Sequence, residues 1–576
     1  MTNQSTTMEN ENIVGWGPQI DNHSTISNAI AIGLRRLGIE EVFTIVGGGI
    51  APLAHALQAC KFKIRHFRHE GGAAFAAVEA SIASGKPVAV CVTTGPGLFN
   101  SLTGIAAGRA DGGRILLLSG STSPAMRGKG AVQETSPETL PTELFAPGSL
   151  FHFARLVADA SEFPLIFSRL EGGFQRSGGF VAHLSLPLSL QSLPGQPFPA
   201  PDVKTYEARA SSDAIHDVIS LLRGRRFGVW AGYGATQASK ELRQLVERTG
   251  CSVIATPRAK GVFPENDEHY IGVSGTGAHP SIMQYMQDYA PEYFLVLGSR
   301  LGEVTSFWSS AMVPKHGLIH VDIDETAFGA AFPTAKTIGI RAEIRSFLRD
   351  LLNALPPDFG QQPSHSFSLP RMPQLTPRPE RNVRTPFLFQ EVQRIIIDGH
   401  DCPIMAESGN SFAWANHALR FTSPCRYRTS AAFGSMGHFV TGVVGAALVR
   451  NDKVVVVAGD GAMLMNNEIN TAVTYRAKAV WIILNDARFG LTEHGMQALN
   501  LTPVETQIAK TNFAMFAESQ GAKGIVVEKE SELAAALQMA MRSPDPFVVD
   551  VRVDLADCAP MLALRIASLN KQRGTE

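Results

Sequence analysis

The chain has 576 residues, too many for one hydrophobic core, and a length of this order predicts about three or four domains. Hydrophobic residues make up 44% of the sequence and charged residues 18%, which excludes a chain that is disordered throughout. The formal net charge of −1 provides no field to recruit nucleic acid or an anionic membrane, and no apolar run is long enough to cross a bilayer. We therefore expect a cytoplasmic protein without nucleic-acid or membrane partners.

The predicted elements alternate between strands and helices along most of the chain. Residues 1–22 are polar and acidic and predict a flexible tail. After them, short runs rich in β-branched residues alternate with amphipathic stretches, and the clearest runs are 87–92, 226–230, 293–297, 453–457 and 480–484. Such alternation is typical of parallel sheets covered by helices on both faces. The predicted fold class is α/β, with three doubly wound parallel-sheet domains.

Two proline-rich stretches divide this pattern. They cover residues 186–201 and 356–379, and both predict extended linkers because proline interrupts helices and sheets. The predicted organisation is therefore a tail, a first domain, a central domain, a linker and a last domain, over residues 1–22, 23–190, 203–355, 356–382 and 383–576.

The most informative motif follows the predicted strand 453–457. There, Gly459 and Gly461 would let the backbone approach a phosphate, and Ala462 begins a helix whose free N–H groups favour an anion. Asp460, between the glycines, is a suitable ligand for a hard cation, and Asp486 emerges after the next predicted strand. Adjacent parallel strands end at the same edge, so the sequence predicts Mg²⁺ beside a diphosphate, although a lone Gly-Asp-Gly is usually only a turn.

This pattern resembles the fingerprint of the thiamine-diphosphate-dependent enzyme superfamily, and within it the acetohydroxyacid (acetolactate) synthase-like carboligases. Their Gly-Asp-Gly is followed, one helix and one strand later, by Asn-Asn. The resemblance implies that the Asp486 side chain and the Arg488 backbone carbonyl complete the metal site. The chain departs from the pattern because Asp486 replaces the usual asparagine and the intervening segment is one residue shorter.

Two segments upstream extend the resemblance. In the segment Phe-Gly-Ser-Met-Gly-His at 433–438, it implies that the Gly434 carbonyl accepts from the cofactor's 4′-amino group and that Met436 wedges the cofactor into a V shape. Asn410 and Ser411 stand where the family places donors to the diphosphate. Ordinary core packing of Met436 and a solvent-exposed turn at 409–411 are the alternatives.

The N-terminal block supplies the activating acid that the resemblance implies. Glu70 begins an almost uncharged Ala/Gly helix, and in the family a buried glutamate here hydrogen-bonds pyrimidine N1′ of the cofactor. The alternative is a first-turn charge that favours the helix dipole. Gly47, Gly48 and Gly95 correspond to residues that face the thiazolium, and Gln133 corresponds to a polar contact to substrate.

The resemblance also implies the assembly and the role of each domain. The first domain would be pyrimidine-binding and the last diphosphate-binding, and active sites of the family combine these domains from two subunits, so we expect a homodimer or homotetramer. The central domain carries glycine-rich turns at 232–234 and 298–300, where FAD binds in some relatives. Such turns are common, so an empty central domain is favoured over FAD.

The predicted activity is that of a thiamine-diphosphate- and Mg²⁺-dependent carboligase, which decarboxylates a 2-keto acid and transfers the acyl unit to a second carbonyl. Gln133, His438 and His494 are candidates for the acid–base step. Leu98 and Phe99 favour a substrate with an apolar group. The alternatives are a simple 2-keto acid decarboxylase, a C–C lyase, a non-catalytic family scaffold and a nucleotide-dependent dehydrogenase.

Overall fold

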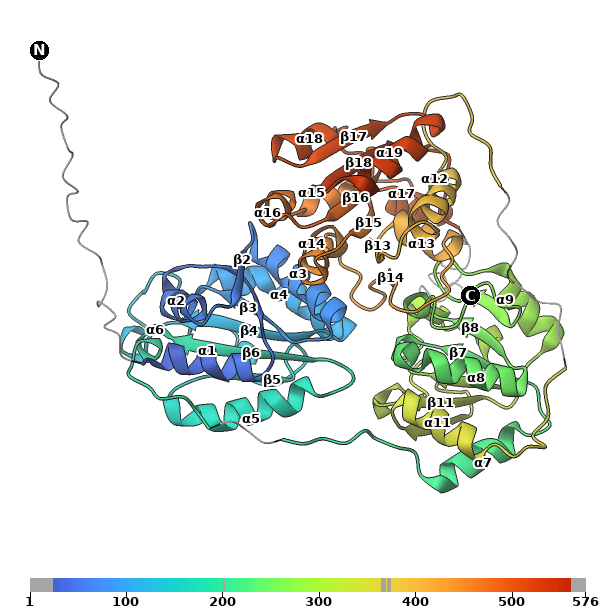
Figure 1. Cartoon of the computed structure of the whole chain (residues 1–576), viewed down its shortest axis with the longest axis horizontal. Coiled ribbons are helices and arrows are strands. Elements are labelled where there is room, and N and C mark those ends of the chain that lie inside the picture. Colours follow the sequence, from blue (N-terminus) through green and yellow to red (C-terminus); the bar gives the residue numbers. More distant parts are fainter. Residues whose placement is uncertain (1–23, 200–202, 364–368, 370–373, 561–576) are drawn as a thin grey trace, which may run out of the picture.

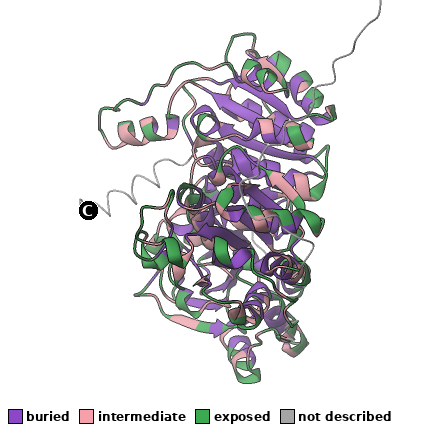
Figure 2. Ribbon diagram, turned by 90° about the vertical axis from the view of Figure 1, so that its left-hand side faces the viewer, coloured by how far each residue is buried: buried purple, intermediate pink, exposed green. Residues whose placement is uncertain are grey.

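Three parallel sheets form the framework of the protein, and a computed structural model shows them (Figure 1). The structure describes residues 24–199, 203–363, 369 and 374–560, so the predicted tail lies outside the described residues. Each sheet has six strands and carries helices on both faces, which confirms the predicted fold class. Figure 2 shows the strands buried beneath helices whose outer faces are exposed.

The first sheet has the order β2-β1-β3-β4-β6-β5. Alternate residues of its strands enter two separate cores, because Ala89 and Cys91 of β3 pack on one face and Val88 and Val90 on the other. A strand buried on both faces must be apolar throughout, as this one is. The strands are β1 (Glu41–Ile45), β2 (Lys63–His66), β3 (Val88–Val92), β4 (Arg114–Ser121), β5 (Phe153–Leu156) and β6 (Phe180–Pro187).

The central sheet has the order β12-β11-β10-β7-β8-β9 and is likewise parallel throughout. It too separates two apolar cores, one on each face. Its strands are β7 (Phe227–Ala231), β8 (Ser252–Ala255), β9 (Tyr270–Val273), β10 (Tyr293–Leu297), β11 (Leu318–Asp322) and β12 (Thr337–Arg341).

The third sheet has the order β14-β13-β15-β16-β18-β17. The chain leaves β13 toward β14 and then crosses back to β15, so the winding direction reverses between β13 and β15. Ligands of doubly wound sheets bind at such a reversal. The strands are β13 (Ile404–Ala406), β14 (Tyr427–Arg428), β15 (Val454–Gly459), β16 (Ala479–Asn485), β17 (Lys523–Val527) and β18 (Phe547–Arg552).

The helices fall into three sets, one for each sheet. Those of the first domain are α1 (Ile26–Arg36), α2 (Ala51–Ala59), α3 (Glu70–Ser84), α4 (Pro96–Asp111), α5 (Phe163–Phe174) and α6 (Leu188–Gln191). The central ones are α7 (Ser212–Leu222), α8 (Ser239–Thr249), α9 (Pro280–Gln284), α10 (Glu303–Ser306) and α11 (Ile344–Ala354). The last are α12 (Thr385–Val392), α13 (Asn410–Ala418), α14 (His438–Arg450), α15 (Asp460–Met465), α16 (Ile469–Tyr475), α17 (Gly490–Ala498), α18 (Phe513–Ser519) and α19 (Glu530–Arg542). None of the described helices is long and apolar enough to span a membrane.

The first predicted linker begins too early. Leu186 and Pro187 belong to β6, and residues 188–191 form α6. Proline at the end of a strand is tolerated because few ladder bonds remain to be made there, so its presence did not mark the end of the domain. In the second stretch, α11 ends at Ala354 and α12 begins at Thr385, and parts of the intervening segment lie outside the described residues.

The first and third domains meet through α3 and α14. A Cβ at Gly445 would lie 2.0 Å from the Ala76 carbonyl oxygen, and one at Gly442 would lie 2.6 Å from Glu79 Cγ. Such close approach explains why eight of the fifteen residues of α3, a helix buried over most of its length, are alanine or glycine. The same close contact excludes water from the side chains of Glu79 and His438, which lie between the two helices.

Candidate active site

The candidate site lies at the edge of the third sheet where the winding direction reverses. Asn410 begins α13 after β13, and Asp460 directly follows β15. β16 pairs with β15 and is followed by Asp486, so both acids emerge side by side. The strand order therefore brings together residues that the sequence separates by whole helices.

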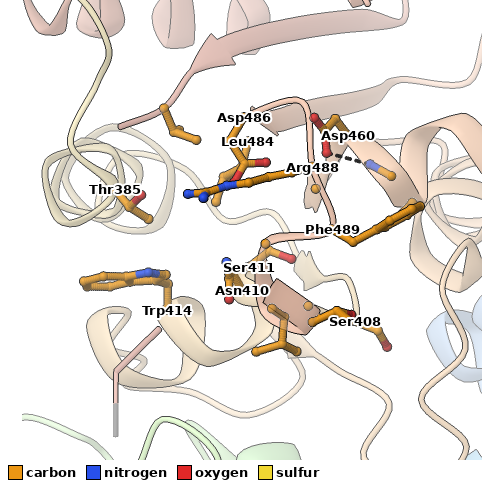
Figure 3. A pocket seen from close by; sticks show the side chains of 18 of the residues that line it. Thr385, Ser408, Asn410, Ser411, Trp414, Asp460, Leu484, Asp486, Arg488 and Phe489 are labelled. Carbon is orange, nitrogen blue, oxygen red and sulfur yellow. Dashed lines mark hydrogen bonds and ion pairs between the residues drawn. The ribbon is translucent and has the colours of Figure 1, made fainter. Parts of the chain in front are cut away.

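A cavity of about 250 Å³ opens at this edge (Figure 3). In the view shown, Asp460, Asp486 and Arg488 lie above Asn410, Ser411 and Trp414. Every cofactor- or metal-binding residue that the sequence predicts for this domain lines the cavity: Asn410, Ser411, Gly434, Met436, Gly459, Asp460, Gly461, Ala462, Asp486 and Arg488. Their assignment to particular ligand atoms stays a prediction.

Asp460 and Asp486, which we call the pocket acids, lack full charge compensation. The Asp460 carboxylate accepts from the N–H groups of Gly461 and Ala487, each at 2.7 Å. Burial, together with the neighbouring Asp486 charge, nevertheless raises its pKa to about 7. Burial also raises the pKa of Asp486, against the opposing effect of Arg488. A divalent cation would stabilise the ionised form of both acids, whose pKa values are raised by burial.

The cavity also offers donors and space for an anion. The helices α13 and α17 both begin at it without a side-chain cap. The first N–H of α17, that of Gly490, donates to the Arg488 carbonyl at 3.0 Å, so the start of α13 is the better place for an anion. A Cβ at Gly459 would meet nothing within 4 Å, which leaves its backbone open to a ligand. The Oδ1 atom of Asn410 is buried without a hydrogen-bond partner among the described residues, and a half-turn of this amide would direct its N–H donors toward an anion. These features fit a metal-bound diphosphate.

Residues 429–437 form the loop between β14 and α14, which we call the cofactor loop. It carries Gly434, with φ 64°, and Met436, which packs beside Gly461. The Gly434 carbonyl, predicted to accept from the cofactor, accepts from the Ser408 hydroxyl at 2.9 Å. A carbonyl oxygen has two lone pairs, so this bond leaves a second one for a ligand.

The predicted residues of the first domain gather at the edge of their own sheet, where β1 and β3 end. A Cβ at Gly47 would lie 2.6 Å from Thr93 Oγ1, which makes glycine necessary there. Gly95 has φ 56°, and its N–H donates to Thr135 at 2.6 Å. Gln133, two residues before Thr135, accepts from the Thr94 hydroxyl at 3.1 Å.

Glu70 lies beside this group but is half-buried, whereas the sequence predicts a buried acid. Its carboxylate accepts from the Asn100 amide at 3.0 Å, and a Cβ at Gly97 would lie 3.4 Å from it. Glu70, Gly48 and Gln133 do not line the cavity of the third domain. The protomer thus presents its two groups of predicted residues at separate places.

His438 is placed differently from its predicted role. Its side chain is fully buried, its Nε2 lies 3.0 Å from Glu79 Oε1, and its ring stacks on Phe439. A group enclosed between α3 and α14 cannot reach a substrate in the cavity. The expectation that His438 performs the acid–base step is therefore corrected to a role in the junction of the two domains. Leu98, expected near substrate, is instead part of the first domain's core.

Sequence reasoning missed several residues of the cavity. The sequence pointed only to the backbone carbonyl of Arg488, but its side chain also belongs to the cavity. Its Nε atom lies 3.1 Å from Asp486, and its Nη1 atom lies 2.6 Å from Glu493. The sequence did contain a signal for this contact, because Arg488 follows the unusual acid Asp486 by two residues. Thr385 and Trp414 also line the cavity, from α12 and α13, and no local pattern marks them.

Close packing of two turns explains the glycines Gly232, Gly234 and Gly298 of the central domain. A Cβ at Gly232 would lie 2.2 Å from the Gly298 carbonyl oxygen, and one at Gly234 would lie 2.8 Å from Gly298 Cα. The two turns therefore pack backbone against backbone at the ends of β7 and β10, where the winding direction reverses. Binding of FAD there stays an untested prediction.

The three doubly wound domains, with acids and uncapped helix starts at one reversal point, have the architecture of an α/β enzyme whose ligand binds at that point. Family models agree: the N-terminal TPP binding domain of the thiamine pyrophosphate enzymes matches residues 24–140, their central domain residues 216–351 and their C-terminal TPP binding domain residues 407–551. The chain belongs to the thiamine pyrophosphate (thiamine diphosphate) enzyme family.

Curated relatives match along nearly the whole chain. A putative acetolactate synthase large subunit of Mycobacterium tuberculosis is 27% identical, over 92% of this chain and 98% of that protein. A putative thiamine pyrophosphate-containing protein of Bacillus subtilis is 25% identical, over 92% of each. The acetolactate synthase isozyme 1 large subunit of Escherichia coli is 26% identical, over 90% of this chain and 92% of that protein. The chain is thus a thiamine-diphosphate-dependent enzyme similar to acetolactate synthases.

Proposed function

We propose that the protein is a Mg²⁺-dependent carboligase that decarboxylates a 2-keto acid and transfers the acyl unit to a second carbonyl compound. The observation that carries the proposal is the convergence of all predicted diphosphate and metal residues on one cavity, which contains two acids whose pKa values are raised by burial. Similarity to acetolactate synthases over nearly the whole chain supports the ligase reaction.

The roles of the residues follow from their chemistry. Asp460, Asp486 and the Arg488 carbonyl would bind Mg²⁺, whereas Asn410, Ser411 and the start of α13 would bind the diphosphate. Bound thiamine diphosphate would supply the electron sink that lets a 2-keto acid lose carbon dioxide. Met436 would contact the middle of the cofactor from the cofactor loop.

The first domain would complete the site from a second subunit. Glu70 would share a proton with the cofactor's pyrimidine, and Gln133 would contact substrate. Around both groups of residues, large apolar side chains are exposed on the protomer: Phe99 at 45%, Val132 at 90%, Phe433 at 43%, Leu464 at 49% and Met465 at 60%. Patches of this kind mark protein interfaces, and a homodimer would bury both Glu70 and these side chains.

We assign residues 23–190 to pyrimidine binding and 383–576 to diphosphate binding, with a central domain at 203–355 and a linker at 356–382.

The test is incubation of the purified protein with thiamine diphosphate, Mg²⁺ and a panel of 2-keto acids, with and without an acceptor aldehyde. We expect ketols by mass spectrometry, and Glu70→Gln should lower kcat/KM by about 10²–10⁴-fold because a positioned proton-transfer group is lost. Carbon dioxide and free aldehyde without any ketol, even with acceptor present, would show a simple decarboxylase or a lyase instead.

Comparison of Leu98→Ala with Phe99→Ala tests the apolar substrate group. Only Phe99→Ala should change substrate preference.

A further inference from the structure

A fully enclosed ion network lies between α3 and α14. Glu79 Oε2 accepts from Arg428 Nε at 2.9 Å, and Oε1 accepts from Arg428 Nη2 at 2.6 Å. The same Oε1 lies 3.0 Å from Nε2 of His438. The three side chains are between 0% and 8% exposed. The proposed function uses none of them, so the burial of the charged pair Glu79 and Arg428 needs another explanation.

The positions of the partners along the chain are informative. Arg428 is the last residue of β14, and His438 is the first residue of α14. The residues between them are the cofactor loop, which lines the cavity through Gly434 and Met436. One carboxylate from the first domain is therefore bound to both ends of the loop that faces the cofactor in the third domain.

The loop between these ends has few other attachments. Residues 432–434 are exposed on the protomer, and both Gly434 and Gly437 have positive φ, at 64° and 86°. Gly434 donates to Ser430 at 3.3 Å and accepts from Ser408 at 2.9 Å. The place of the loop in the cavity therefore depends strongly on where its two ends are held.

The charges show that Arg428 fills the position a cation would take. Ligand atoms of Glu79, Asp111 and His438 lie within 4.8 Å of one another, as in a metal site. The Arg428 guanidinium, however, lies 2.6 Å from Glu79 and 3.5 Å from Asp111. Burial alone would raise the pKa of Glu79, but Arg428 outweighs it and lowers the pKa to about 2. The carboxylate stays charged and bound rather than titrating.

The network also reaches the central domain. The Arg258 guanidinium donates to the Asp111 carbonyl at 2.8 Å and lies 4.1 Å from the Tyr233 ring centroid. Asp111 is the last residue of α4, next to Arg428. All three domains thus meet at the group that holds the ends of the cofactor loop.

We propose that Glu79 is a positioning residue for the cofactor, because it fixes both ends of the loop 429–437 and thereby the Gly434 carbonyl and Met436 in the cavity. The inference rests on the proposed function, since it presumes that thiamine diphosphate occupies this cavity. Glu79 touches neither cofactor nor substrate and acts through Arg428 and His438. It joins the loop to α3, the helix that begins with Glu70.

The first test compares Glu79→Gln with the wild type in the full chain. We expect the Kd for thiamine diphosphate at fixed Mg²⁺, from titration calorimetry, to rise about tenfold to hundredfold, as when supporting partners of binding groups are removed. Hydrogen–deuterium exchange of residues 429–437 should be faster even without cofactor, because the ends of the loop are released.

A matched control separates positioning from general destabilisation. Glu241 is also buried and accepts from two arginines, Arg345 at 3.0 Å and Arg349 at 3.2 Å, but it lies in α8 of the central domain. Glu241→Gln should leave both the Kd and the exchange of the cofactor loop unchanged. An equal rise in Kd for the two variants would overturn the inference.

A second pair of variants covers the case in which Glu79→Gln does not fold. His438→Gln and His438→Asn both lose the stacking on Phe439 and Phe75, at 4.4 and 5.0 Å between centroids. The glutamine amide nitrogen can take the place of Nε2 beside Glu79, whereas the shorter asparagine amide does not reach it. We expect His438→Asn to raise the Kd more than His438→Gln.

The outcomes separate the two proposals. A wild-type chain that binds no thiamine diphosphate overturns the proposed function and this inference with it. A wild type that binds, beside a folded Glu79→Gln variant with unchanged Kd and unchanged loop exchange, overturns the inference alone. Equal effects of His438→Gln and His438→Asn would also overturn it, because they would assign the histidine to stacking.

Discussion

Two places at which the structure buries acids, the contact between α3 and α14 and the cavity of the third domain, differ in what balances the charge of the acid. Glu79, between α3 and α14, is bound by Arg428 and His438, and Arg428 lowers its pKa to about 2 against the effect of burial. Asp460, in the cavity, lies near another acid, Asp486. Burial of Asp460 and the negative charge of Asp486 together raise the pKa of Asp460 to about 7. Removal of a compensated acid leaves its buried partner unpaired, whereas an uncompensated acid would be stabilised by an external cation.

The largest expected effect tests the compensated group. We expect Glu79→Ala to lower the free energy of unfolding by about 3–5 kcal/mol, because it leaves Arg428 buried without its main partner. Asp460→Asn removes an uncompensated charge and should leave the cofactor-free protein as stable or more stable. Urea unfolding followed by tryptophan fluorescence measures the free energy of unfolding of both variants. A larger decrease for Asp460→Asn than for Glu79→Ala would contradict the assigned difference between the two acids.

The second effect tests the uncompensated group. Thiamine diphosphate and Mg²⁺ together, at about a hundredfold excess over Kd, should stabilise the folded protein by about 2.7 kcal/mol, and a chelator should remove the effect. Asp460→Asn should lose most of this stabilisation, whereas Glu241→Gln should keep it. Thermal unfolding with and without EDTA measures the difference, and stabilisation independent of Mg²⁺ would argue against the metal site.

The third effect is the pH dependence of binding. The pKa of Asp460 is raised in the folded state, so its carboxyl favours the protonated form, and its contribution to cofactor-free stability falls as pH rises from about 4 to about 7. Mg²⁺ needs the ionised form, so affinity should fall about tenfold for each pH unit below 7. Calorimetric titrations from about pH 5.5 to about pH 8 measure this slope. Asp460→Asn is the control and should show a smaller slope, because one of the two acids no longer titrates.

Glu79 should show the opposite sign. Its folded pKa is lowered, so its stabilisation is fully present above the unfolded value of 4.5 and is lost only as pH falls toward about 2. Acid unfolding of the wild type and of Glu79→Gln measures this contribution. A difference between them that disappears already near neutral pH would contradict the assigned charge state.

The smallest effect concerns the unusual acid at position 486. The Asp486 charge contributes to the raised pKa of Asp460, so Asp486→Asn should lower that pKa. The pH at which Mg²⁺-dependent binding is half lost should then fall by up to about one unit. An unchanged midpoint would mean that Arg488, 3.1 Å from Asp486, already neutralises it.

Local pattern was sufficient for much of the fold. The apolar runs 293–297 and 480–484 correspond to β10 and β16, because strands buried on both faces must be apolar along their whole length. Proline was a weaker guide, since Pro187 lies within β6. Of the candidate site, the motif around Asp460 was recognisable because glycines and an acid after a strand have a local chemical meaning.

Other parts of the site had no local signal. Thr385 and Trp414 reach the cavity only through the packing of α12 and α13. His438 follows a cofactor motif directly, yet its side chain points into the junction with α3, and only the position of Glu79 explains why. A residue next to a motif in sequence need not share its surroundings, because a helix start can turn the side chain toward another domain.

The sequence by itself determined the fold class, the family and the groups that would bind a metal and a diphosphate, because strand periodicity and short motifs depend on neighbouring residues. The tertiary structure decided which acids are compensated, since Glu79 meets Arg428 and His438 only after two distant domains have packed together. Charge compensation is a property of three-dimensional neighbourhood, and sequence separation carries no information about it.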